Sequence, residues 1–326
     1  MTGVEAARQP TTGTGFALRD PWPWPAFARL ARVGDELGYA AIFLPEIRGR
    51  DALAALAALA GETSQVLLGT GIVPMGSRRP ALTAMAAATV HERSGGRAVL
   101  GLGTGGSAAG ALGRLEEQVR EIRAFLDEAV ARDGDEGGEG DGRLALARPV
   151  PIWIAALGPR AVALAGRIAD GVLLNWCSPE RVALARDQVA SSAVDAGRDP
   201  SGITIAAYVR SAVSDDAAGA AGAREALAGA AGEYAALPAY RRQFETMGLG
   251  PAARAASEPA GEAEARLDSV APLIDGVCLS GDAHGARERL DEYRQAGCDL
   301  PVVYPVPFGP DAEASVAATL SALAPR

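Results

Sequence analysis

Glycines follow two apolar segments of the chain, at positions where a flat cofactor could approach the backbone. The first segment, over 66–73, contains Gly69-Thr70-Gly71, and the second, over 98–102, runs into Gly103-Thr104-Gly105-Gly106. Glycine has no side chain to keep the backbone away from a flat ring or a phosphate. Parallel sheets of buried strands bind ligands at the ends of those strands. We therefore expect a cofactor site at these turns.

Few side chains of this sequence could carry out a reaction by themselves. All 31 basic residues are arginine. Because Schiff-base aldolases, pyridoxal-phosphate enzymes and P-loop nucleotidases need a lysine amine, these classes are excluded. The two histidines, His91 and His284, are far apart, so no bound metal is expected. An enzyme with so few nucleophiles and proton carriers would take its chemistry from an organic cofactor.

Strands and helices are predicted to alternate along most of the chain. The expected strands lie at 15–18, 41–44, 66–73, 98–102, 152–155, 171–174, 203–209 and 301–304. The expected helices lie at 26–37, 52–62, 80–94, 114–131, 160–169, 179–196 and 282–297. This alternation is typical of an α/β protein that folds as a single (β/α)8 TIM barrel, whose functional groups lie at the carboxyl ends of the strands.

Three segments depart from this alternation. Residues 215–270 are rich in alanine, glycine and glutamate and predict a helical excursion, whereas residues 132–143 predict an acidic, glycine-rich surface loop. Residues 1–14 are expected to be flexible. No change of composition is deep enough to divide the chain, so 1–326 is expected to form one domain.

The glycines Gly101, Gly103 and Gly106 have the spacing of a dinucleotide-binding fingerprint, and they follow a strand and precede a helix. Such a site also needs an acidic residue at the end of the next strand. The acidic residues at the right distance, Glu117 and Glu121, fall inside a predicted helix instead. A glycine-lined barrel mouth is therefore the better interpretation.

Composition and charge limit the possible partners. The net charge of −9 argues against a nucleic-acid or anionic-membrane surface, and no apolar run reaches the length of a membrane span. The amino-terminal residues lack a signal-peptide pattern. Three cysteines without a metal-ligand spacing are typical of reduced thiols, so a cytoplasmic protein is expected.

An ordered set of short motifs closely resembles the luciferase-like flavin and deazaflavin oxidoreductases, above all the branch similar to methylenetetrahydromethanopterin reductase, which uses coenzyme F420. The matching segments are Leu44-Pro45-Glu46, Gly49-Arg50-Asp51-Ala52, Leu68-Gly69-Thr70-Gly71-Ile72-Val73-Pro74, Ser77-Arg78-Arg79-Pro80-Ala81-Leu82-Thr83-Ala84-Met85-Ala86, Ser94-Gly95-Gly96-Arg97-Ala98-Val99-Leu100-Gly101-Leu102-Gly103, Pro151-Ile152-Trp153-Ile154-Ala155-Ala156-Leu157-Gly158-Pro159-Arg160 and Ala169-Asp170-Gly171-Val172-Leu173-Leu174-Asn175. The resemblance covers residues 40–210 well and 274–304 more loosely.

This resemblance implies a bacterial-luciferase-like barrel with an insertion near the seventh unit, F420 at the barrel mouth, and hydride transfer to or from a small-molecule substrate. In that family a non-prolyl cis peptide in the third strand backs the ring system. The matching bond in this chain is Gly71–Ile72. An ordinary trans strand, with Gly71 kept for packing, is the alternative.

The resemblance also implies roles for further residues. The backbone of Gly103, Thr104, Gly105 and Gly106 and of Ala156, Leu157, Gly158 and Pro159 would bind the cofactor, the second turn through the N-terminus of a helix. Asn175 would bond the polar edge of the cofactor or serve only as a turn former. Glu46 would contact the cofactor or act as a catalytic proton donor; a salt bridge with Arg48, Arg50 or Arg78 is the alternative.

Two other functions remain open at this point. An FMN-dependent monooxygenase of the same fold would activate oxygen, and a non-catalytic flavin-binding protein would keep the fold without turnover. The segment Ser107-Ala108-Ala109-Gly110 has no carboxylate where some deazaflavin dehydrogenases of the family carry their acid, so the substrate stays open. A homodimer is expected from the family.

Overall fold

The computed structural model describes residues 10–19, 22–106, 108–130, 146–258 and 263–326. Its strands are β1 (Gly15–Ala17), β2 (Ala41–Leu44), β3 (Leu67–Thr70), β4 (Val73–Pro74), β5 (Ala98–Gly103), β6 (Ile152–Ala155), β7 (Gly171–Asn175), β8 (Thr204–Val213), β9 (Cys278–Gly281) and β10 (Leu300–Pro305). Its helices are α1 (Trp24–Glu36), α2 (Ala52–Leu59), α3 (Pro80–Arg93), α4 (Ala111–Val130), α5 (Pro159–Ile168), α6 (Pro179–Asp195), α7 (Ala217–Ala235), α8 (Pro238–Thr246), α9 (Gly250–Ser257), α10 (Ala263–Val277), α11 (Ala283–Gln295) and α12 (Ala312–Ala322), with a short 3₁₀ turn at Pro200–Gly202.

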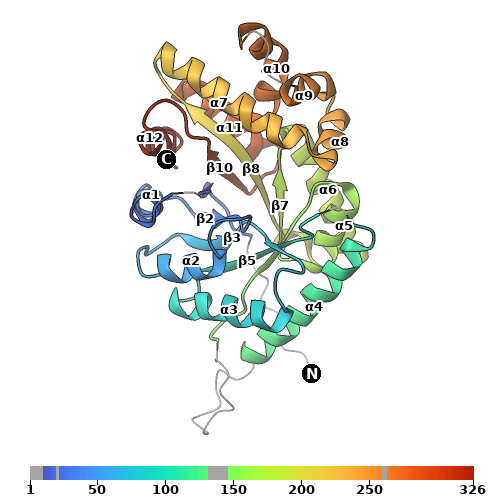
Figure 1. Ribbon diagram of the computed structural model, residues 1–326. Helices are drawn as coiled ribbons and strands as arrows, with labels where there is room; N and C mark the ends of the chain where they lie inside the picture. Colours follow the sequence, from blue (N-terminus) through green and yellow to red (C-terminus); the bar gives the residue numbers. More distant parts are fainter. Residues whose placement is uncertain (1–9, 20–21, 107, 131–145, 259–262) are drawn as a thin grey trace.

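Eight parallel strands close into a barrel in the order β1-β2-β3-β5-β6-β7-β8-β10. Closure is made by β10, which pairs with β1 through Val302 opposite Gly15 and with β8 through Leu300 opposite Ala206. The helices surround this barrel, and Figure 1 views it with the strands converging near the centre. The predicted (β/α)8 barrel is confirmed.

Alternate side chains of the strands fill the inside of the barrel, as the two-residue period of a strand requires. Large aromatic rings dominate there: the ring centroids of Phe43 and Trp153 lie 5.5 Å apart. Each ring depends on a glycine of the next strand. A Cβ at Gly69 would lie 2.5 Å from the Phe43 ring, and one at Gly171 would lie 2.7 Å from the Trp153 ring. These two glycines therefore serve packing.

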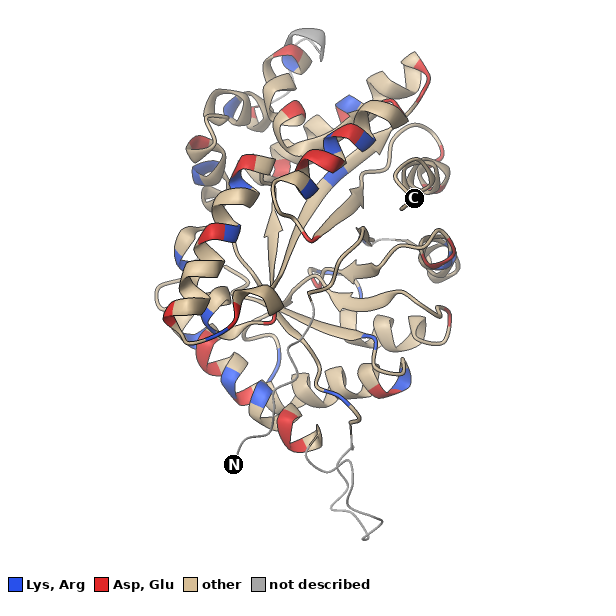
Figure 2. Ribbon diagram, turned by 180° about the vertical axis from the view of Figure 1, so that it is seen from behind, with Lys and Arg blue, Asp and Glu red and all other residues tan. Residues whose placement is uncertain are grey.

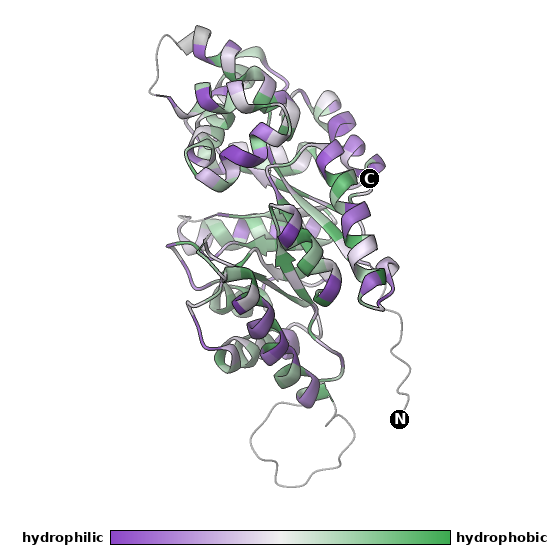
Figure 3. Cartoon of the chain, turned by 90° about the vertical axis from the view of Figure 1, so that its right-hand side faces the viewer, coloured by the Kyte–Doolittle hydropathy of each residue, from purple (hydrophilic) through white to green (hydrophobic). Residues whose placement is uncertain are grey.

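The outer faces of the strands form a second layer of apolar contacts with the helices. Most charged residues lie on the helices and loops, whereas the strands carry few of them (Figure 2). The hydropathy of the chain follows the same division, with hydrophobic strands inside and hydrophilic helix faces outside (Figure 3). None of the helices in the described part of the chain combines the length and the apolar composition that a membrane crossing requires.

The helical excursion predicted at 215–270 lies after the seventh barrel strand, β8, and consists of α7, α8, α9 and α10, which pack around a core of their own. Buried Leu227, Phe244 and Ile274 belong to that core. Its helices stand together at the top of Figure 1, with α7 against β8. The excursion returns through β9, which pairs with the last four residues of β8.

Two strands differ from their predictions, and the helix α12 was not predicted at all. The strand expected at 66–73 is divided into β3 and β4 because Gly71 and Ile72 leave the ladder between them. The strand β9 was missed, since Cys278–Gly281 is too short to show a period and directly follows a helix.

The remaining expectations concern segments at the edge of the described structure. Within the segment expected to be flexible, Thr11 N–H donates to Thr204 Oγ1 at 2.9 Å and Gly13 N–H to the carbonyl of Asp299 at 3.2 Å. Residues 1–9 and the acidic loop 132–143 lie outside the described residues.

Candidate functional site

The residues selected from the sequence gather at one end of the barrel, because they follow the carboxyl ends of parallel strands. Glu46 follows β2, Gly71 and Ile72 separate β3 from β4, Gly103–Gly106 end β5, Ala156–Pro159 join β6 to α5, and Asn175 ends β7. The strands beneath are buried, whereas Ile72, Thr104 and Leu157 are half-buried. A barrel binds its ligands at this end.

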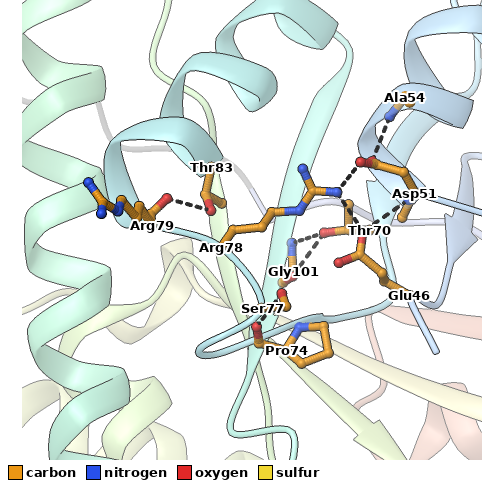
Figure 4. Close-up of polar contacts among 11 residues, drawn as sticks. Glu46, Asp51, Ala54, Thr70, Pro74, Ser77, Arg78, Arg79, Thr83 and Gly101 are labelled. Atoms are coloured by element: carbon orange, nitrogen blue, oxygen red, sulfur yellow. Dashed lines mark hydrogen bonds and ion pairs between the residues drawn. The ribbon is translucent and has the colours of Figure 1, made fainter. Parts of the chain in front are cut away.

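Glu46 forms an ion pair with Arg78 (Figure 4). Its Oε2 lies 3.1 Å from Arg78 Nη2 and also accepts the Ala52 N–H at 3.1 Å, and both charged side chains are only 15% exposed. Arg78 contacts the carboxylate of Asp51 as well, and Asp51 Oδ1 accepts the Ala54 N–H at 3.0 Å to cap α2. Arg78 therefore joins the loop before α3 to the start of α2.

These contacts settle which partner Glu46 has among the three arginines considered. Arg50 instead lies over the Phe27 ring, 4.9 Å from its centroid, while Arg48 is exposed. Burial acts to raise the pKa of Asp51, but the Arg78 guanidinium and the backbone N–H groups of α2 outweigh it and lower that pKa. A proton on either carboxylate would weaken the pairing with Arg78.

The glycines beside β4 and β5 fall into two groups. Gly71 and Gly103 are closely packed: a Cβ at Gly71 would lie 2.6 Å from Tyr208 Oη, and one at Gly103 would lie 3.1 Å from the Ile72 side chain. Gly105 has a φ of +66°, which favours glycine, and lies against Pro74. In contrast, a Cβ at Gly106 would have no neighbour within 4 Å.

The turn Ala156–Pro159 leaves the amino-terminal end of α5 without a side-chain cap. Gly158 is the N-cap residue and Pro159 the first helical residue, and the space around a Gly158 Cβ is open to 4 Å. By contrast, Ser178 caps the following helix α6 with its side chain. Arg181 Nη2 donates to the carbonyl of Leu157 at 3.1 Å and fixes the turn. Uncapped N–H groups of a helix favour an anion.

Asn175 makes side-chain bonds within the protein. Its Nδ2 donates to Tyr240 Oη at 2.9 Å, its Oδ1 accepts from Arg210 Nη1 at 3.0 Å, and its carbonyl accepts from Gln243 Nε2 at 2.7 Å. Tyr240 and Gln243 belong to α8, so these bonds attach the helical insertion to the barrel mouth. Asn175 is followed by Trp176 in the left-handed region at φ +52°.

Several residues of this region were missed in the sequence analysis, chief among them Arg210 and Tyr208. Both lie on β8 and, two residues apart, face the inside of the barrel. The predicted strand ended at residue 209. The signal available in the sequence was Arg210 itself, because it lies two residues after Tyr208 and so continues the inward-facing positions of an otherwise apolar strand.

The histidines and cysteines lie away from the mouth turns or are fully enclosed. His91 is buried near the end of α3 and His284 is exposed beside Glu288. Cys177, Cys278 and Cys298 are buried free thiols. Within the described ranges, no group of three histidine, cysteine or carboxylate side chains could hold a metal ion.

Comparisons with known proteins find relatives along most of the chain. The family model described as luciferase-like monooxygenase matches residues 5–300. The 5,10-methylenetetrahydromethanopterin reductase of Methanolobus tindarius is 31% identical, over 94% of this chain and 97% of the relative. A putative coenzyme F420-dependent oxidoreductase of Mycobacterium tuberculosis is 28% identical, over 85% of this chain and 89% of the relative.

A solved structure shares the fold. The coenzyme F420-dependent tetrahydromethanopterin reductase of Methanopyrus kandleri superposes with a TM-score of 0.68 at 21% identity. The superposition covers 95% of this chain and 97% of the other. The similarity therefore extends through the helical insertion as well as the barrel.

Proposed function

The chain belongs to the luciferase-like monooxygenase family, and from this premise we propose that it is an oxidoreductase that binds coenzyme F420 at the barrel mouth. The reaction is hydride transfer between the deazaflavin and a small organic substrate. The observation that carries the proposal is the similarity to F420-dependent relatives and methylenetetrahydromethanopterin reductases over nearly the whole chain.

The residues at the mouth fit such a cofactor. Gly106 and Gly158 have open space where a side chain would stand, and the uncapped start of α5 suits a phosphate. Gly103–Gly106 and Ala156–Pro159 would hold the cofactor through their backbones, with Ile72 and Gly71 behind the ring and Asn175 at its polar edge. When bound, the deazaflavin supplies a carbon that accepts or gives up a hydride, which favours two-electron chemistry.

In this proposal the protein orients the reactants and excludes water. Ile72, half-buried against Gly103, offers an apolar surface for a flat ring. Glu46, paired with Arg78, acts as a positioning residue that keeps the loop before α3 against α2. The helices of the insertion cover part of the mouth through the bonds from Asn175 to α8. Water exclusion of this kind protects a reactive hydride donor.

A fluorescence titration with F420 and, separately, with FMN tests the cofactor. We expect tight binding of F420 and weak binding of FMN, followed by turnover of reduced or oxidised F420 with a member of a substrate panel. A preference for FMN would instead indicate an oxygen-activating monooxygenase. Binding without turnover on any reductant or oxidant would indicate a flavin-binding protein without catalysis.

We also propose a homodimer and a reducing compartment, the cytoplasm. Leu82 and Met85 lie one turn apart on α3 and are each 53% exposed, an apolar stripe that a second copy would cover. The three cysteines are buried as free thiols, as is usual where disulfides do not form.

A further inference from the structure

Arg210 is a buried cation at the mouth end of the barrel. It lies on β8, two residues after Tyr208 and four after Ala206, both of which face the barrel interior. The residue is only 4% exposed. The Tyr304 ring of β10 lies beneath its guanidinium, with 3.8 Å between Arg210 Cζ and the ring centroid. Arg210 thus stands at the top of the stack of aromatic side chains inside the barrel.

No carboxylate balances this charge. Across the ranges that the structure describes, no acidic oxygen lies within 4 Å of the Arg210 guanidinium; its partners are neutral. Nη1 donates to Asn175 Oδ1 at 3.0 Å and Nη2 to Tyr234 Oη at 3.2 Å. The rings of Trp176 and Tyr234 lie 4.9 and 5.1 Å from Cζ. Aromatic faces attract a cation, yet they leave it without the counterion that buried charges ordinarily have.

Two neighbours of Arg210 are donors without acceptors. Tyr208 Oη and Trp176 Nε1 are buried and have no hydrogen-bond partner among the residues that the structure describes. Tyr208 Oη lies against Gly71, since a Cβ there would come within 2.6 Å of it. Burial raises the pKa of Tyr208 well above its usual value, so the phenol keeps its proton and remains a donor. Buried polar groups of native proteins are rarely left unpaired, so these two donors call for an acceptor.

We propose that Arg210, with Tyr208 beside it, binds a carboxylate of the substrate, so that the substrates of this protein are small organic acids. The guanidinium would receive the carboxylate in place of the neutral oxygens of Asn175 and Tyr234, and two N–H groups of arginine match two carboxylate oxygens. One cation, walled by aromatic rings, suits a singly charged planar group better than a phosphate dianion. That the bound acid is a substrate rests on the proposed oxidoreductase function. That the ligand is a carboxylate rests on Arg210.

Calorimetric titration with benzoate as the probe tests this inference, with benzamide as the uncharged control. The full chain is titrated alone and again after loading with F420. We expect benzoate to bind and benzamide to bind at least about tenfold more weakly, because a charge-assisted pair contributes more than a neutral one. In Arg210→Gln the preference for benzoate should disappear, and in Arg210→Lys only part of it should remain, because lysine keeps the charge but loses the two-point match.

Two further variants separate a direct contact from a folding effect. Tyr208→Phe removes only the unpartnered hydroxyl and should weaken benzoate binding while leaving benzamide unchanged. Arg224→Gln removes an arginine of α7 that already has a carboxylate partner, Asp275 at 2.9 Å, and should change neither. Equal binding of benzoate by wild type and Arg210→Gln, or no binding by wild type, would overturn the inference.

The F420 titration of the same variants keeps the two proposals apart. If F420 binds the wild type and benzoate does not, the carboxylate site is wrong while the oxidoreductase function stands. If benzoate binds through Arg210 and F420 does not bind, the ligand class stands and the cofactor proposal fails. Loss of F420 binding in Arg210→Gln without any loss of benzoate preference would assign the cation to the cofactor and overturn the inference.

Discussion

Single residues show why glycine patterns are ambiguous in a sequence. Gly69 and Gly171 make room for the rings of Phe43 and Trp153, and Gly101 lies against the Thr70 carbonyl. Gly106 and Gly158, by contrast, face open space. The same residue type therefore serves packing at some positions and a close approach at others. A sequence cannot separate these cases, because the deciding neighbours come from other strands.

A substitution of Gly71 tests whether the closely packed glycines serve packing. In Gly71→Ala the new Cβ would meet Tyr208 Oη at 2.6 Å and the Pro45 backbone at 3.0 Å, so the strand must move. We expect a loss of about 1–3 kcal/mol in the free energy of unfolding, measured by urea denaturation. Gly229→Ala is the control, since that exposed helical glycine of α7 has no neighbour within 4 Å. Equal stabilities of the two variants would contradict the packing role.

Asp35 makes stability depend on pH. Its carboxylate, on α1, accepts the N–H groups of Ser64, Gln65 and Val66 at 2.7, 2.9 and 2.7 Å. Burial acts to raise the pKa of Asp35, but these bonds outweigh it and lower that pKa below its unfolded value. The stabilisation is therefore complete at neutral pH and is lost as the pH falls through the lowered pKa.

The matching experiment compares Asp35→Asn with the wild type across pH. We expect the variant to lose about 2 kcal/mol of unfolding free energy at pH 7, because asparagine offers one accepting oxygen and no charge. The two curves should converge in acid. Asp195→Asn, at an exposed position of α6, is the control and should stay within about 0.5 kcal/mol at every pH. A difference that does not change with pH would exclude the ionised carboxylate as its cause.

At the scale of elements, the presence of most helices and of the eight barrel strands followed from local pattern, whereas strand pairing did not. The period of apolar residues and the helix caps, such as Asp51 before α2, lie within a few positions of one another. The break of the third strand at Gly71 and the short strand β9 depend on partners far along the chain. The position of Glu46 just after β2 followed from the sequence, but its pairing with Arg78 among three nearby arginines needed the fold.

Substitution of Gly158 at the start of α5 should raise the stability of the protein while weakening its binding of F420. Gly158→Asp would add a capping side chain and raise the unfolding free energy by a few tenths of a kcal/mol, since Asp is a better N-cap than Gly. Its negative charge would oppose an anionic cofactor group, so F420 should bind at least about fivefold more weakly. Gly158→Ser caps without charge and should bind more tightly than Gly158→Asp. Unchanged F420 affinity in Gly158→Asp would place the anionic group elsewhere.

On the scale of the whole molecule, the single barrel could be predicted because its repeating units share one pattern. The insertion was recognised only as a loss of that pattern, and its four helices enclose a core that no local signal described. Arg210 was missed because the predicted strand ended one residue before it, and its aromatic neighbours come from the residue after β7, from α7 and from β10.

The proposed dimer is tested at this scale too. The wild type is expected to run as a dimer in size-exclusion chromatography with light scattering. The double variant Leu82→Glu, Met85→Glu should be monomeric, because it places two charges on the apolar stripe of α3. Leu184→Glu, which changes an even more exposed leucine of α6, should remain dimeric. A monomeric wild type would contradict the proposal.

The strand β8 runs without a break from the barrel into the helical insertion, and this limits how the two parts can move. It is buried over all ten residues, pairs with β10 along its middle and continues without a break into its pairing with β9. Arg210 and Ser211 pair with both β9 and β10, so the strand has no hinge between the barrel and the insertion. Amide protons at Arg210–Val213 should exchange with deuterium as slowly as those at Ile205–Val209. The barrel and the helical insertion would then unfold together in one cooperative step, and the insertion would be as stable as the barrel strands.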